Sequence, residues 1–294
     1  MRRVGVLLFV PALGPVVDGF RRGLEGLGFQ EGRDVEYVQR SVEGRVDQLP
    51  AAVESLGQQV DLILACGTPA AKAAAQGSRP VVFAPVFDPV GAGLVERADQ
   101  PGRPVTGVSG MIPGDRKLAQ LSELFPGLSE VTVLFNPQDP NSPVEAASLE
   151  AAGEKRGIAV RRAEVTDVAA LEAALPKVMA EAQVILLSLD RLTDGELERI
   201  AAAAREARKP LVAHNAAGVR RGALVALEAD PAHLGRRAAA IAQRILNGAD
   251  PARIPVEYAE EARLVLNAGV AEAVGYRLPG SVQPDEVVPA ERGV

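Results

Sequence analysis

The stretch 60–76, VDLILACGTPAAKAAAQ, indicates the fold class of this chain. An apolar run long enough for a buried strand leads into an alanine-rich helical segment, and only Gly67, Thr68 and Pro69 separate the two. A buried strand followed directly by a helix is the repeating unit of parallel α/β sheets. The first N–H groups of such a helix lack partners inside it. The turn is therefore either capped by Thr68, with Pro69 at the first helical position, or binds the polar end of a ligand.

The same strand–turn–helix pattern recurs along the whole chain. Apolar runs in the first half predict buried strands over residues 4–10, 35–40, 62–66, 80–86 and 105–110. Runs in the second half predict strands over residues 130–136, 158–165, 184–189, 210–215 and 223–229. Helical patterns of ten or more residues separate many of these runs, and such alternation predicts βαβ units with a parallel sheet.

The two series of strands resemble each other, because each places a helix that ends near glycine before its second strand. We therefore predict an α/β fold of two similar lobes, each with a doubly wound parallel sheet, joined by a multi-segment hinge. The glycine- and proline-containing stretch 110–117, GMIPGDRK, is the predicted first crossing. The predicted first lobe comprises residues 1–112 and about 232–258, and the second comprises 113–231 and about 259–294.

Composition limits the functions open to the chain. Its 294 residues suffice for two domains of ordinary size, and 47% of them are hydrophobic. The net charge of −6 predicts no nucleic-acid partner, because phosphates would be repelled. The single cysteine, Cys66, and the two histidines, His214 and His233, are not spaced as metal ligands. We therefore predict no metal site and no cofactor.

The amino-terminal run MRRVGVLLFVP combines two arginines with apolar residues, as the start of a signal peptide does. No small-residue cleavage site follows it, and residues 4–10 fit a buried first strand equally well. We interpret the run as a strand, with the signal peptide absent from this sequence. No apolar run approaches the roughly 18 residues that a membrane-spanning helix requires.

Capping residues follow several of the predicted strands. The Thr68-Pro69 arrangement recurs in three further pairs: Asp88-Pro89, Ser142-Pro143 and Asp230-Pro231. Two capping boxes are also predicted, formed by Ser142 with Glu145 and by Thr193 with Glu196. Each of these residues can simply start a helix, whatever the protein does.

The shared position of these turns also favours a ligand site. In open parallel sheets, ligands bind outside the carboxyl ends of the strands, where all these turns are predicted to lie. If two lobes face each other with those ends, helix N–H groups can bind a carboxylate and aspartates can bind an amine. Asp88 and Asp190, which each follow an apolar strand, are the predicted ammonium partners.

Several stretches of the chain, in consistent order between about Val4 and Val288, match a known protein family. They are GFRRGLEGLGFQEGRDVEY (19–37), GTPAA (67–71), PVVFAPVFDPVGAGLV (80–95), VTGVSG (105–110), PGLSEVTVLFNPQDPNS (126–142) and LVLNAGVAEAVGYRLP (264–279). In these stretches the chain resembles ABC-transporter substrate-binding proteins of the tryptophan/tyrosine-binding type. The resemblance implies a type I periplasmic-binding fold, with two α/β lobes and a ligand cleft between them.

The resemblance also implies which residues contact the ligand. The turns that correspond to cleft-lining loops of the family contain Thr68, Pro69, Asp88, Asn141 and Ser142. Contacts are likewise expected from strand ends of the second lobe, at Asp190, Asn215 and Asp230. The implied ligand is a small zwitterion or carboxylate, such as an amino acid, with aromatic amino acids included.

The function implied is that of an extracytoplasmic solute-binding protein, which captures its ligand without catalysis and delivers it to an ABC transporter permease. We expect a monomer. An enzyme working through Asp88, Asp190 or Asp230 is the alternative, although the sequence has no G-x-S-x-G elbow and no G-x-x-x-x-G-K-[ST] phosphate loop. The effector-binding core of a transcription regulator shares this fold, but it would need a helix-turn-helix before Val4, where three residues stand.

Overall fold

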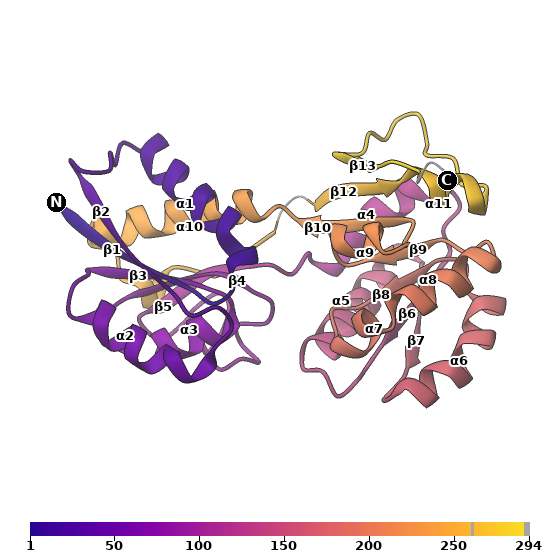
Figure 1. Cartoon of the computed structure of the whole chain (residues 1–294), viewed down its shortest axis with the longest axis horizontal. Helices are drawn as coiled ribbons and strands as arrows, with labels where there is room; N and C mark the ends of the chain where they lie inside the picture. Colours follow the sequence, from indigo (N-terminus) through magenta and orange to yellow (C-terminus); the bar gives the residue numbers. More distant parts are fainter. Residues whose placement is uncertain (260–261, 291–294) are drawn as a thin grey trace. The chain divides into compact units, whose positions relative to one another are not determined.

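The computed structural model describes residues 1–259 and 262–290 of the chain (Figure 1). The chain divides into two compact units. The first unit contains Met1–Met111 and Ala229–Ala259, and the second contains Ile112–Glu228 and the chain after Ala259. The chain therefore passes from one unit to the other three times.

The first unit contains a six-stranded sheet in the order β11-β5-β4-β3-β1-β2, and its paired strands run parallel. The strands are β1 (Arg2–Leu8), β2 (Val35–Ser41), β3 (Leu62–Cys66), β4 (Val81–Val86), β5 (Val105–Ser109) and β11 (Glu257–Tyr258). The helices are α1 (Gly14–Gly26), α2 (Leu49–Gly57), α3 (Thr68–Ala74) and α10 (Pro231–Leu246), with 3-10 turns at Pro11–Leu13, Val46–Gln48 and Pro251–Arg253. The residues of β3 are all fully buried, as the apolar run predicts.

Helices cover both faces of this sheet. The helices α2 and α3 pack together on one face, and α10 packs along α1 on the other (Figure 1). Two glycines allow the close approach of α1 and α10. A Cβ atom at Gly235 would lie 2.0 Å from the carbonyl oxygen of Val16, and one at Gly19 would lie 2.1 Å from that of Ala232. The helix α10, with which the chain re-enters the first unit, is thus held against α1 by close packing of the two backbones.

The second unit contains a seven-stranded sheet in the order β13-β12-β10-β9-β8-β6-β7. Its strands are β6 (Glu130–Phe135), β7 (Ala159–Glu164), β8 (Ile185–Leu187), β9 (Leu211–Ala213), β10 (Val225–Ala229), β12 (Ala262–Asn267) and β13 (Glu286–Val288). Its helices are α4 (Gly114–Leu124), α5 (Asn141–Arg156), α6 (Val168–Glu181), α7 (Arg191–Gly195), α8 (Leu197–Glu206), α9 (Ala216–Arg220) and α11 (Ala268–Val274). The strands from β7 to β10 are parallel, as are β12 and β13.

Two α/β units built on parallel sheets confirm the predicted fold class. Every predicted strand is present, with ends within two residues of those expected. The amino-terminal run forms β1, which confirms its interpretation as a strand. The strands β11, β12 and β13, of two, six and three residues, were not predicted. Among the described helices, none combines the length and the apolar character needed to cross a membrane.

Candidate functional site

A polar pocket of about 710 Å³ lies in the second unit. It forms where β6, β8 and β9 end, and these three strands are neighbours in the sheet. The residues that follow the strands, together with the start of α5, supply much of its lining, including Asn136, Asp139, Asn141, Asp190, His214 and Asn215. The structure thus brings together three of the residues predicted to bind ligand, namely Asn141, Asp190 and Asn215.

Asp190 joins the loop after β6 to the start of α7. Its Oδ1 accepts a 2.8 Å hydrogen bond from the N–H of Thr193, and its Oδ2 accepts one of 3.1 Å from the N–H of Asn136. The residue is only 3% exposed. The predicted capping box of Thr193 with Glu196 is wrong, because Asp190 caps α7 and Thr193 lies inside that helix. The extended backbone of Asp190, directly before α7, is the conformation that an N-cap requires.

Asn215 caps α9 and holds the neighbouring histidine. Its Oδ1 accepts from the N–H of Gly218 at 3.0 Å, which leaves its Nδ2 to donate to Nε2 of His214 at 2.8 Å. Nε2 must be unprotonated to accept this bond, so the arrangement suits a neutral imidazole. Burial lowers the pKa of His214, against the opposing effect of nearby carboxylates such as Glu145. The pocket therefore contains a neutral histidine beside its carboxylates.

The start of α5 differs from the prediction. Asn141 is the first residue of the helix and Ser142 is the second, so Ser142 cannot be its cap. Ser142 is fully buried, and its Oγ lies 3.5 Å from the carbonyl oxygen of Leu189. The predicted capping box of Ser142 with Glu145 is therefore wrong.

Glu145 belongs instead to a buried ion pair with Lys117 of α4. The side chains of Lys117 and Glu145 are 5% and 3% exposed. The second carboxylate oxygen of Glu145 accepts from Ser188 Oγ at 2.6 Å and from the N–H of Leu189 at 3.4 Å. Burial opposes ionisation of Glu145, but the charge of Lys117 and the hydrogen bonds outweigh it and lower the pKa of this carboxyl. The pair holds the segment that leads from β8 into the pocket.

In the first unit, Thr68 and Pro69 follow β3 and begin α3. The N-cap is Gly67, with φ of +95°, and Thr68 is the first helical residue. The prediction that Thr68 caps the helix is therefore wrong. The left-handed turn at Gly67, which glycine adopts without steric cost, starts the helix one residue earlier than the sequence pattern suggests.

Asp88 follows β4, the neighbour of β3 in the sheet, and is followed by a turn rather than by the predicted helix. Its Oδ1 accepts from the N–H of Gly91 at 2.9 Å, and the N–H of Ala92 donates to its carbonyl oxygen at 3.0 Å. Gly93, with φ of +70°, ends the turn before a helix can form. Thr68 and Asp88 thus lie beyond the carboxyl ends of adjacent strands.

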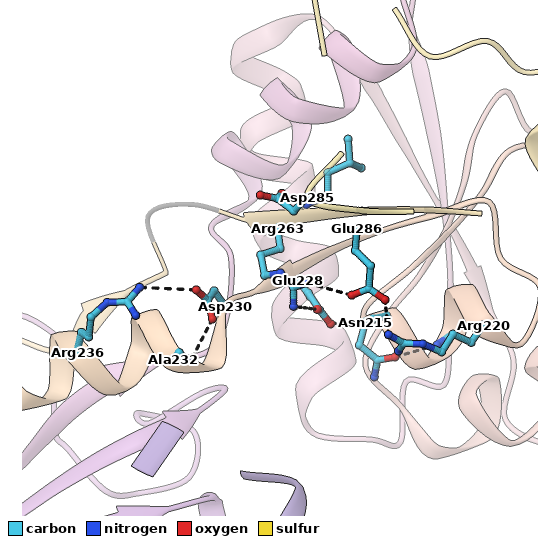
Figure 2. Close-up of polar contacts among 12 residues, drawn as sticks. Asn215, Arg220, Glu228, Asp230, Ala232, Arg236, Arg263, Asp285 and Glu286 are labelled. Atoms are coloured by element: carbon cyan, nitrogen blue, oxygen red, sulfur yellow. Dashed lines mark hydrogen bonds and ion pairs between the residues drawn. The ribbon is translucent and has the colours of Figure 1, made fainter. Parts of the chain in front are cut away.

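Asp230 caps α10, as predicted. Its Oδ1 accepts from the N–H of Ala232 at 2.9 Å, and its Oδ2 lies 3.7 Å from Arg236 (Figure 2). Asp230 directly follows β10 of the second sheet, but its helix belongs to the first unit. It therefore stands at a crossing of the chain rather than in the pocket at β6, β8 and β9.

Sequence reasoning did not select several residues of that pocket. His214, Arg191, Asn136, Asp139 and Asp194 line it but were not predicted to contact ligand. Each follows or lies near a strand end, which is the signal that could have found them. Within residues 1–259 and 262–290, no group of three or more histidine, cysteine or acidic side chains could hold a metal ion.

A protein-family model and a named relative match this chain over most of its length. The family model described as "ABC transporter substrate binding protein" matches residues 3–288. The "Tyrosine-binding protein" of Clostridioides difficile (strain R20291) is 26% identical over 278 residues, which cover 93% of this chain and 81% of the relative.

Two solved structures show the same similarity over almost the full length. The ligand-free, open structure of a Clostridium difficile substrate-binding protein with adhesive properties is 25% identical, with 99% and 100% of the two chains covered and a TM-score of 0.87. The complex of a Streptococcus pneumonia ABC domain with L-Trp is 26% identical, with 98% and 99% covered and a TM-score of 0.73.

Proposed function

We propose, since the chain belongs to the family of ABC transporter substrate-binding proteins, that it captures an amino acid and delivers it to an ABC importer. The observation that carries the proposal is the match of residues 3–288 to the family, which spans both units and the polar pocket. The role of this family is to bind a substrate, without catalysis. Within the proposal, the protein works outside the cytoplasm, as a monomer that meets the permease of its transporter.

The chemistry of the pocket suits the charged groups of an amino acid. Asp139, Asp190 and Asp194 supply carboxylates, and Arg191 supplies a cation. Each carboxylate oxygen of Asp190 accepts one backbone N–H. A carboxylate has about four lone-pair sites in total, so an ammonium group can still bind there. We propose Asp190 as the partner of the ligand's ammonium group.

The proposed contacts include residues of both units. In the second unit they are Asn141, Asp190 and Asn215, which line the pocket, together with the buried Ser142. In the first unit they are Thr68, Pro69 and Asp88, at the ends of β3 and β4, and Asp230, at the crossing of the chain.

Aromatic amino acids are the first ligands to test. One relative is named for tyrosine, and one related structure contains L-Trp. The side chains that line the pocket of the second unit are polar or aliphatic. In the proposal this pocket binds the amino and carboxylate groups, and the aromatic ring of the ligand does not stack there.

A thermal-shift screen of amino acids, sugars and purines tests the proposal. A ligand present at a hundred times its dissociation constant adds about 2.7 kcal/mol of stability to a folded protein. The expected result is a rise in melting temperature with one or a few amino acids and no rise with sugars or purines. Stabilisation by a sugar or purine alone would overturn the assignment to amino acids.

A further inference from the structure

Glu228 lies next to both the ligand pocket and a crossing of the chain. It is the last residue of the second unit before the chain enters the first, and Arg263 lies in β12, shortly after the chain has returned. Figure 2 shows the two side chains directed at each other, with Asn215 and Glu286 close by.

The carboxylate of Glu228 holds the start of α9. Its Oε2 accepts a 2.8 Å hydrogen bond from the N–H of Ala216, the first residue of that helix. Its Oε1 accepts a 3.1 Å bond from Nη1 of Arg263, and only 15% of the side chain is exposed. Ala216 directly follows Asn215, which lines the pocket. One carboxylate thus connects a pocket segment to the strand that returns from the first unit.

The far end of α9 is held by the same network. Arg220, the last residue of the helix, pairs with Glu286 of β13, and Nη2 of Arg263 donates to that glutamate at 3.0 Å. Arg263 therefore bridges the two carboxylates that hold the first and last residues of α9 (Figure 2). A helix of five residues is too short to be stable alone, so its position depends on such contacts.

We propose that Glu228, oriented by Arg263, is a positioning residue for ligand binding. It holds Ala216 in place and thereby fixes Asn215 and His214, which face the ligand. This inference rests on the proposed function of the pocket. Ala216 and Arg263 donate to different oxygens of Glu228, and a glutamine at position 228 replaces one of these oxygens with a donor NH2 group, so in the same orientation it keeps only one of the two bonds.

The test compares Glu228→Gln and Arg263→Met with the control Glu130→Gln. Glu130 pairs with Arg161 at 2.6 Å with 18% of its side chain exposed, but it begins β6, at the end of the strand opposite the pocket. Three quantities are measured: amide hydrogen exchange of residues 214–220 without ligand, the dissociation constants for L-tyrosine and L-tryptophan, and the melting temperature.

Glu228→Gln is expected to speed exchange in 214–220 and to weaken binding about tenfold, the effect of losing one hydrogen bond to a charged group. The control is expected to change only the melting temperature. Arg263→Met should weaken binding in the wild-type background and add little in the Glu228→Gln background, since the two residues act as one unit.

Unchanged exchange in Glu228→Gln would overturn the proposal, and so would faster exchange with unchanged affinity. Equal loss of affinity in Glu130→Gln would show a general effect of lost stability, which also overturns it. A wild-type protein that binds neither L-tyrosine nor L-tryptophan would instead exclude these two aromatic amino acids as ligands. The exchange measurement would then decide alone whether Glu228 positions the 214–220 segment.

Discussion

At the scale of single residues, Asp190 has a structural role and a proposed one: its carboxylate joins the loop after β6 to α7 and, in the proposed function, binds the ammonium group of the ligand. It accepts from the N–H of Asn136, which follows β6, and from the N–H of Thr193, which lies inside α7. Asp167, by comparison, only caps a helix. Its Oδ1 accepts from the N–H of Ala170 in α6 at 2.8 Å, and Asp167 does not line the pocket. A comparison of variants at the two positions therefore distinguishes the effect of capping from the effect of ligand binding.

We predict that Asp190→Asn weakens amino-acid binding tenfold or more, whereas Asp167→Asn leaves affinity unchanged. The substitution at position 190 removes the negative charge that the ammonium group needs and replaces one acceptor by a donor. Asp167→Asn should leave stability nearly unchanged, because asparagine caps a helix about as well as aspartate, whereas Asp190→Asn should lose about 1 kcal/mol, because the amide keeps only one of the two backbone hydrogen bonds. Isothermal titration measures affinity and urea unfolding measures stability. Unaltered affinity in Asp190→Asn would show that this residue only caps α7.

The buried pair of Lys117 and Glu145 leads to a second prediction. Lys117→Met leaves the Glu145 carboxylate buried without a counter-charge, which costs about 3–5 kcal/mol. The double variant Lys117→Met/Glu145→Leu removes both charges and should recover most of that loss. Arg97→Met is the control, because Arg97 and its partner Asp99 are 67% and 64% exposed and such pairs contribute about 0–1 kcal/mol.

The free energy of unfolding in urea measures all three variants. A double variant that is as unstable as Lys117→Met would contradict this account. It would mean that the lost stability comes from the packing of the two side chains, not from the unpaired charge.

At the scale of elements, α1 and α10 pack so closely that Gly235, at their contact, cannot be replaced by a larger residue without a shift of the backbone. The carbonyl oxygen of Val16 lies 2.0 Å from where a Cβ at Gly235 would be. Gly26, at the end of α1, has nothing within 4 Å of such an atom. Of these two helical glycines, only Gly235 is required for packing.

Gly235→Ala should therefore destabilise the protein by about 3 kcal/mol or more, since backbone must move to relieve the clash. Gly26→Ala should be neutral or stabilise by up to about 1 kcal/mol, because alanine favours the helix. Thermal or urea unfolding compares the two variants. Equal stability of both would show that α1 and α10 are packed less closely than described.

Elements also show how far sequence alone leads. The strands were predictable because buried parallel strands are continuous apolar runs, as in β3. The exact helix starts were less predictable from the sequence. The cap at Asp230 was predicted correctly, but the N-cap of α3 is Gly67, not Thr68 as expected. The cap is decided by the backbone angles with which the chain leaves the strand, and these depend on tertiary packing. The two-residue β11 is too short for a periodic signal.

The candidate site was predictable only in part for the same reason. Asp190 was selected because it follows an apolar strand, and Asn141 and Asn215 were selected through the family resemblance; the structure gathers the three in one pocket. The strands β6, β8 and β9 are neighbours because the order of strands in the sheet differs from their order in the sequence. No local sequence pattern indicates that order. The buried Lys117 was missed because its partner, Glu145, lies 28 positions away and reads as part of a capping box.

At the scale of the whole molecule, the chain passes between its two units three times, and Glu228 and Asp230 flank one of these passages. The family match covers both units, so the function proposed belongs to the complete chain rather than to either unit. The central claim of the proposed function is that the protein binds an amino acid reversibly and leaves it chemically unchanged.

Titration calorimetry of the full chain with each L-amino acid, beginning with L-tryptophan and L-tyrosine, tests this claim most directly, with the ligand recovered and identified afterwards by mass spectrometry. The account predicts one site per chain with a dissociation constant of about 1 μM or tighter for at least one L-amino acid, equivalent to about −8 kcal/mol, and an unaltered ligand. Absence of binding by every amino acid, or recovery of a chemically changed ligand, would contradict it.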